Sequence, residues 1–144
     1  IPLRVWHAEA ATDVALGVAA LLRANDHDAS SINARDISNI PFYGIARGFL
    51  SGKYRPGVTE VDSKRAAGAR EYATDKNYAV LTTMDEVAKN HNVSLSAVAL
   101  AWLRAQPSVS VPIASARTVE QVEEIVQVVA LSVEEMENLD AISA

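Results

Sequence analysis

Ser115, Arg117 and Thr118 are the residues whose types and spacing point most directly to a chemical role, and that role is anion binding. They follow an apolar run at residues 109–114 and precede a helical pattern. The free amides of a first helical turn and the positive end of the helix dipole attract phosphate, and Arg117 adds a planar, permanently charged fork. The same residues also fit a simpler interpretation, in which Thr118 caps a helix and Arg117 is a solvated surface charge.

A second segment with chemical potential, residues 41–54, has the sequence PFYGIARGFLSGKY. Gly48 and Gly52 permit close approach of a ligand to the backbone, and the Lys53 ammonium group can neutralise phosphate charge. Phe42 offers a flat aromatic face to a planar ring. On pattern alone, however, Phe42 is equally a core residue, and two glycines four positions apart are a weak signal.

Other combinations of catalytic or metal-binding residue types are incomplete. His7 and Glu9 have the His-x-Glu spacing of zinc deaminases, but the sequence contains no cysteine to complete that ligand set. The motifs Gly-x-Ser-x-Gly, Ser-x-x-Lys and His-Glu-x-x-His are absent. A hydrolase or lyase site built from Ser51 or His91 stays an alternative, without an assembled nucleophile and base. We therefore predict no metal and no catalytic residue in this chain.

Composition restricts the class of protein. The 144 residues suffice for one domain, since a chain of this size buries about 70% of its unfolded surface. No apolar run approaches the ~20 residues needed to cross a bilayer, so we expect a soluble protein with no membrane partner. The net charge of −5 and the scattered Lys and Arg residues disfavour nucleic acid as a partner. The lack of cysteine weakly favours a reducing compartment, and we expect a cytoplasmic protein.

The first 39 residues carry few informative signals. Apolar spacing predicts an amphipathic helix at residues 8–24, and residues 25–39 are rich in Asn, Asp and Ser, which favour turns. The chain begins at Ile1 rather than Met and lacks the features of a secretion signal. Processing, a cloned fragment and proteolysis each account for this beginning, and the sequence does not choose among them.

The pattern of apolar residues predicts the strands and helices that would position the two segments described above. Short apolar runs at residues 40–45 and 109–114 predict strands buried on both faces of a parallel sheet. Residues 55–76 lack a sustained apolar face and predict an excursion with at most one short helix. Helices are predicted at residues 78–90, from Ser94 up to Pro107, and at residues 118–129 and 132–142. Strands that alternate with helices indicate an α/β protein.

Capping residues mark the ends of these helices. Asn92 is suited to the left-handed conformation that ends a helix, and Ser94 is a good N-cap for the next one. The sequence SVEE at residues 132–135 fits the Ser-x-x-Glu capping box. We expect Trp102 to lie in the core.

The segments 41–54 and 111–124 (VPIASARTVEQVEE), in this order, resemble the cofactor half of an aldo-keto reductase. The resemblance covers about Ile40 to Ala144 and implies the C-terminal half of a (β/α)₈ TIM barrel. A closed barrel needs eight strands and about 250 residues, so this chain cannot close one alone. We therefore divide the chain into an unassigned N-terminal helix and polar linker at residues 1–39 and a half-barrel at residues 40–144.

The resemblance also implies roles for individual residues around NADP(H). Ser115 and Arg117 would hold the 2′-phosphate, and Gln121 and Glu124 would lie beside the adenine. The family usually has Asn where this chain has Ile125, so an adenine contact is missing.

In the earlier segment, the resemblance places Phe42 where the family has a Tyr that stacks on the nicotinamide. Gly48 and Lys53 would approach the pyrophosphate. Tyr43 and Gly44 stand where Ser and Pro are common in the family.

Catalysis in the family uses an Asp, a Tyr, a Lys and a His that precede the position of Pro41, and none of the four can be matched here. The leading hypothesis is therefore the NADP(H)-binding half of an enzyme that reduces aldehydes or ketones, not catalytically complete alone. The alternative is a non-catalytic, self-associating half-barrel with a vestigial cofactor surface. Exposed edges of parallel strands attract a partner, so we expect a homo-oligomer.

Overall fold

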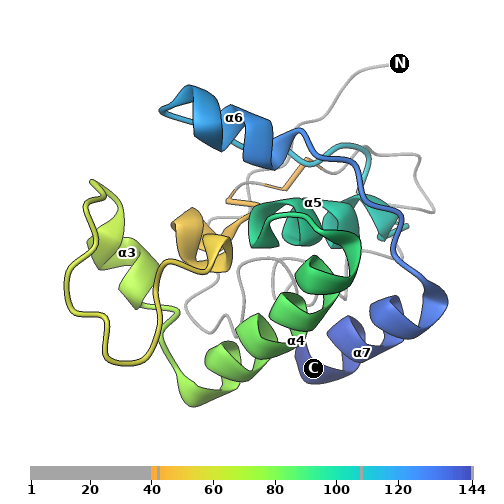
Figure 1. Ribbon diagram of the computed structural model, residues 1–144, viewed down its shortest axis with the longest axis horizontal. Coiled ribbons are helices and arrows are strands. Elements are labelled where there is room, and N and C mark those ends of the chain that lie inside the picture. Colours follow the sequence, from red (N-terminus) through yellow and green to blue (C-terminus); the bar gives the residue numbers. More distant parts are fainter. Residues whose placement is uncertain (1–39, 42, 108, 144) are drawn as a thin grey trace.

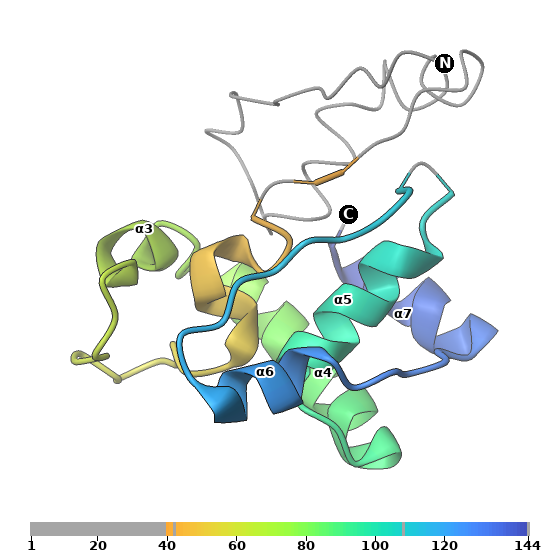
Figure 2. The ribbon, with the colours of Figure 1, turned by 90° about the horizontal axis from the view of Figure 1, so that it is seen from above.

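Helices α4 (Asp75–His91) and α5 (Leu95–Ala105) lie at the centre of the structure (Figure 1). The computed structural model describes residues 40–41, 43–107 and 109–143. Helix α7 (Val133–Ser143) packs on α4, while α6 (Val119–Ile125) and the 3-10 helix η1 (Ala46–Ser51) pack on α5. Helix α3 (Ala66–Arg70) packs on η1. In Figure 2 the connection between α5 and α6 runs alongside η1, and this neighbourhood holds the site described below.

Helix α4 forms where the apolar spacing predicts it. Its apolar stripe is buried, as expected, and consists of Val80, Leu81, Met84, Val87 and Ala88. The helix begins three residues earlier than predicted because the Thr74 hydroxyl accepts a hydrogen bond from the Asn77 backbone N–H. It ends at Asn92, which adopts the predicted left-handed conformation with φ 53°.

The predicted caps of the later helices are also confirmed. The Ala97 N–H donates to the Ser94 hydroxyl at the start of α5. Ser132 and Glu135 form the reciprocal capping box of α7, with N–H to oxygen distances of 3.2 and 2.8 Å. Helix α6 ends at Ile125, four residues short of the prediction. The excursion at residues 55–76 contains one short helix, α3, as expected.

Helix α7 is joined to the central pair by polar contacts. The Trp102 indole N–H donates to the Asp140 carboxylate at 2.8 Å, and Trp102 is buried as predicted. Nε2 of His91 lies 2.9 Å from a carboxylate oxygen of Glu135. The Ser132 N–H, followed by His91, lowers the pKa of Glu135 below its ordinary value, because both favour the charged carboxylate. These contacts hold α7 against α4 and α5.

An aromatic cluster connects η1 to the central helices. Phe49 is fully buried. Its ring centroid lies 6.4, 6.2 and 5.9 Å from those of Tyr54, Tyr72 and Tyr78. Offset and tilted aromatic pairs at such distances are favourable beyond the area that they bury. The cluster therefore fixes η1, which carries one side of the candidate site.

The two predicted strands do not form in the described part of the chain, and this corrects the sequence prediction. Residues 43–45 make a turn into η1, with φ of 60° at Tyr43 and 49° at Ala46. Residues 110–114 have no regular structure, and only an isolated bridge occurs at Val109. A parallel strand needs neighbouring strands to pair its backbone groups, so an apolar run alone is insufficient. The half-barrel is accordingly not confirmed, and the described residues are mostly helical.

Some predictions concern residues outside the described part. The helix at residues 8–24, the linker at residues 25–39 and Phe42 all fall there. The division of the chain at residue 40 likewise stays a prediction. Among the helices that the structure describes, none has the length and apolar character required to span a bilayer.

Candidate cofactor site

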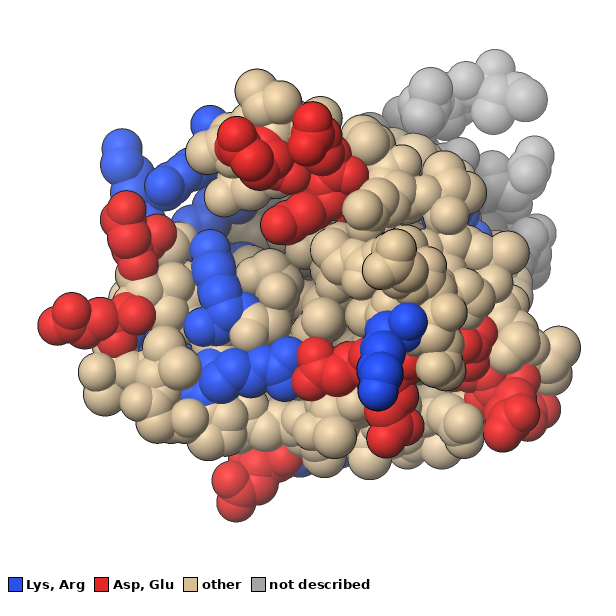
Figure 3. Space-filling model, in the orientation of Figure 1, with Lys and Arg blue, Asp and Glu red and all other residues tan. Residues whose placement is uncertain are grey.

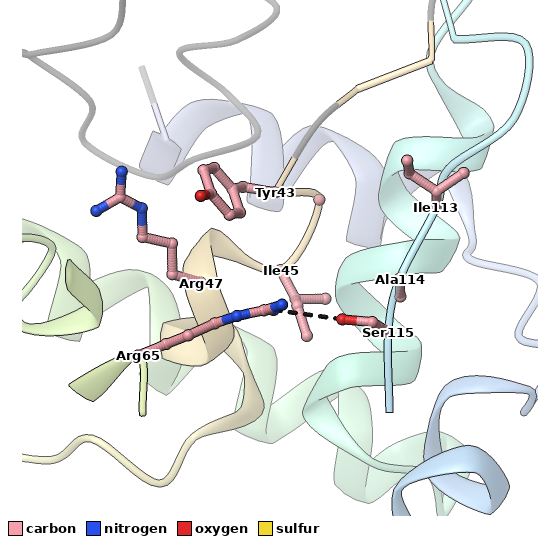
Figure 4. Close-up of a pocket in the computed structure, with 8 residues that line it drawn as sticks. Tyr43, Ile45, Arg47, Arg65, Ile113, Ala114 and Ser115 are labelled. Carbon is pink, nitrogen blue, oxygen red and sulfur yellow. Dashed lines mark hydrogen bonds between the residues drawn. The ribbon is translucent and has the colours of Figure 1, made fainter. Parts of the chain in front are cut away.

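A pocket of about 230 Å³ lies between the turn at residues 43–47 and the extended residues 113–115 (Figure 4). Gly44 brings the two segments together, because a Cβ atom there would lie 3.4 Å from the Ile113 carbonyl oxygen and 2.9 Å from Leu103 Cδ1. The described lining contains two arginines and no carboxylate. It consists of Tyr43, Gly44, Ile45, Arg47, Arg65, Ile113, Ala114 and Ser115. This lining favours an anionic ligand.

Arg65 reaches into the pocket from the excursion that precedes α3. Its guanidinium donates a hydrogen bond to the Ser115 hydroxyl at 3.3 Å, across 50 positions of sequence. Sequence reasoning identified Ser115 and missed Arg65. No local pattern marks an arginine in a polar loop as a partner of a residue so distant along the chain. The contact assembles a hydroxyl and a guanidinium suited to phosphate oxygens.

Arg47 is the second arginine that sequence reasoning missed. Its backbone is left-handed, with φ 55° and ψ 20°, a conformation that costs a residue other than glycine roughly 1–2 kcal/mol. Its guanidinium lies 4.8 Å from the centroid of the Tyr43 ring. A terminal nitrogen lies 3.4 Å from the Glu71 carboxylate, in an exposed pair worth ~0–1 kcal/mol. Nε is buried without a hydrogen-bond partner in the described structure.

The turn before α6 is already engaged by the chain itself. The Arg117 N–H donates to the Gln121 side-chain oxygen at 2.8 Å, and the Gln121 N–H donates to the Thr118 hydroxyl at 3.3 Å. The Glu120 backbone N–H, followed by the Thr118 hydroxyl, lowers the pKa of Glu120. The cap expected from Thr118 is therefore confirmed. The exposed Arg117 side chain stays available to a ligand.

The other residues predicted to bind the cofactor lie in two places outside the lining of the pocket, the loop after Gly48 and helix α6. Gly48 has φ 96°, and a Cβ atom there would lie 3.7 Å from Lys53 Cε, so the two residues are neighbours as expected of one loop. Gln121 and Glu124 lie on α6, where the Glu124 carbonyl oxygen accepts a hydrogen bond from the Ser94 hydroxyl. Of the predicted residues that the structure describes, Ser115 alone lines the pocket.

The charges on the visible face are unevenly distributed. In Figure 3 Lys and Arg side chains gather around η1 and α3, and a group of acidic side chains lies over α6. Within the described residues, no group of three or more His, Cys, Asp or Glu side chains could hold a metal ion. The two arginines in the described lining of the pocket suit an anionic ligand.

Comparison with known proteins gives two findings. Residues 21–144 match the model of the Aldo/keto reductase family. The L-glyceraldehyde 3-phosphate reductase of Escherichia coli O157:H7 is 30% identical over 110 residues, which cover 70% of this chain and 32% of that protein. The chain thus spans about a third of the length of this curated relative.

Proposed function

Because the chain belongs to the aldo/keto reductase family, we propose that it is the NADP(H)-binding portion of an oxidoreductase that reduces aldehydes or ketones. NADPH supplies the hydride in such a reaction. The residues of this chain bind and orient the cofactor. The relative named above is a reductase of a phosphorylated aldehyde, and we include that class among the candidate carbonyl substrates.

The hydrogen bond between Arg65 and Ser115 is the observation that carries this proposal. It places a guanidinium and a hydroxyl together in a pocket whose described lining has no acidic residue. Arg117 is two positions further along and exposed. A phosphate monoester such as the 2′-phosphate of NADP(H) needs this kind of donor set. The pocket is smaller than the roughly 300–1,000 Å³ of sites that enclose a whole ligand, so it suits a phosphate end rather than the full dinucleotide.

Replacement of Arg117 by alanine tests the phosphate assignment. A charge-assisted hydrogen bond contributes about 1.5–3 kcal/mol, and 1.4 kcal/mol corresponds to a tenfold change in affinity. We expect the dissociation constant of NADPH to rise about tenfold, since the exposed position of Arg117 places the effect at the low end of this range. The dissociation constant of NADH, which lacks the 2′-phosphate, should stay unchanged. Calorimetric titration of the full chain measures both.

The matched control is Arg104→Ala, which removes the same charge from an exposed position on α5. It should leave both affinities unchanged. If both variants lost NADPH affinity equally, the loss would come from the change in net charge and not from a contact between Arg117 and the phosphate. Identical NADPH binding by the original chain and Arg117→Ala would contradict the proposed role of Arg117.

One observation favours the alternative function, a non-catalytic module that self-associates. Helix α6 and its C-cap residue expose three valines at helical spacing, Val119, Val122 and Val126, with exposed fractions of 69, 45 and 63%. Such spacing places them on one face of the helix, and an exposed apolar face marks an interaction surface. A second copy of the chain is the partner that this alternative requires.

Light scattering tests the alternative. A self-associating module should form a stable oligomer, and Val122→Glu should shift it toward monomer because a charge is costly at a buried contact. Val58→Glu, at a similarly exposed valine in the excursion, is the control and should leave the mass unchanged. A monomer at every concentration that also binds NADPH would overturn the alternative.

A further inference from the structure

We propose that the valine face of α6 binds an amphipathic helix of another protein, one whose apolar stripe is flanked by lysine and arginine side chains. The valine face consists of Val119, Val122 and Val126, the last of which is the C-cap residue of the helix. None of these residues belongs to the described lining of the cofactor pocket. Binding of such a partner therefore does not depend on NADPH.

Helix α6 is anchored to the start of α5 by two polar contacts of Ser94. The Ser94 hydroxyl donates to the Glu124 carbonyl oxygen at 3.1 Å, and the Ser94 N–H donates to the side-chain oxygen of Gln127 at 2.9 Å. Ile125 packs against the main core, but none of the seven residues of α6 is buried. A helix this short gains most of its stability by packing an apolar face. The valine face is available for that packing.

The spacing of the valines fits a second helix. Residues three and four positions apart are neighbours on a helix surface, so Val122 connects Val119 to Val126 in one stripe. Val128 follows in the connection from α6 to α7 and is 81% exposed (Figure 1). Ridges of side chains at this spacing pack into the grooves of a partner helix. Anchors at the same spacing are typical of an amphipathic helix bound to another protein.

Acidic side chains border the valine face and specify the charge of its partner. Glu123 lies beside the stripe, because it is four positions after Val119 and three before Val126. The other two glutamates of α6 are exposed as well, and Figure 3 shows the acidic group over this helix. Residues 118–143 contain seven Asp or Glu residues and no Lys or Arg. Lysine and arginine on either side of an apolar stripe would complement this surface.

A second copy of the chain fits the valine face less well than a basic helix does. A twofold dimer brings the same surface of both copies together, so the glutamates of one α6 would face those of the other. Like charges across an interface are unfavourable. Charge therefore favours a cationic partner over self-association through this face.

Fluorescence anisotropy with the full chain tests the proposal, with two labelled helical peptides as probes. One peptide has leucine and lysine at amphipathic spacing (LKKLLKLLKKLLKL), and the other has glutamate at every lysine position. We expect saturable binding of the leucine–lysine peptide and no binding of the leucine–glutamate peptide. The affinity should fall as sodium chloride is added, because salt screens exposed charges. Equal binding of the two peptides, or binding of neither, would overturn the proposal.

Substitutions test whether the peptide contacts α6. Val122→Ser removes apolar surface without a change of charge and should weaken binding of the leucine–lysine peptide about fivefold. Its control is Val58→Ser, at an equally exposed valine in the excursion. Glu123→Gln should weaken binding about twofold to fivefold, and Glu60→Gln, at an exposed carboxylate of the excursion, controls for net charge. Controls that weaken binding as much as their matched variants would refute the assignment to α6.

Nuclear magnetic resonance of the isotope-labelled full chain locates the peptide directly. Its addition should shift the backbone amide signals of residues 118–128. Shifts concentrated on α7 instead would reveal general attraction to acidic residues and would overturn the proposal. A stable dimer that Val122→Glu converts to monomer would assign the face to a second copy, with the same consequence. A chain that binds NADPH but not the peptide would refute this inference and leave the proposed function intact.

Discussion

Replacement of Phe49 by alanine should lower the free energy of unfolding by about 3–5 kcal/mol, the usual cost of removing a buried phenylalanine side chain. Phe49 is fully buried and contacts three tyrosine rings, so the neighbouring side chains cannot easily fill the space. Urea denaturation of the full chain, followed by circular dichroism, measures the change. The pocket should also be disturbed, because Phe49 fixes the helix that begins at Ala46.

Val58→Ala is the control for Phe49→Ala. Val58 is 45% exposed, and substitutions at such positions change stability by about 0.5 kcal/mol or less. A loss of stability in Phe49→Ala no larger than in this control would show that the aromatic cluster contributes little to the fold.

Replacement of Gly44 by valine should lower stability by about 1–3 kcal/mol, the range for overpacking a filled interior, and should weaken NADPH binding. The new side chain would collide with Leu103 and approach the Ile113 carbonyl oxygen. The segments that face each other across the pocket would therefore move apart. Denaturation and calorimetric titration of the full chain measure the two effects.

Gly57→Ala is the control for Gly44→Val. It shows how much stability is lost when a glycine is replaced at a position where the new side chain meets no neighbour. Gly57 has φ 82°, and nothing in the described structure lies within 4 Å of a Cβ atom there. Its substitution should lower stability by about 1 kcal/mol through backbone strain and leave NADPH affinity unchanged. If Gly44→Val bound NADPH as tightly as Gly57→Ala, the close approach at Gly44 would have no part in shaping the site.

The extended segments show where sequence reasoning failed. Residues 40–45 and 109–114 have the apolar character of buried strands, yet the first ends in a turn and the second exposes Val111 and Ile113 by 48% each. An apolar run predicts that a segment is buried among neighbours. It does not supply those neighbours, and a strand exists only when adjacent strands pair with it.

The candidate site was only partly accessible from sequence for a related reason. Ser115 could be identified because it stands in a recognisable motif with Arg117. Arg65 could not, since its contact with Ser115 spans 50 positions. Arg47 lies within a segment that the sequence singled out. Its left-handed backbone and its position over Tyr43, however, could not be predicted from the residue types.

By itself, the sequence determined the central helices and several of their caps, because caps and apolar spacing act between residues that are a few positions apart. Asn92, Ser94, Thr118 and the pair of Ser132 and Glu135 perform the capping roles that their types predict. Only the tertiary structure decided that Arg47 and Arg65 share one pocket with Ser115. That arrangement depends on packing between distant segments, such as the close approach allowed by Gly44, and no local pattern encodes it.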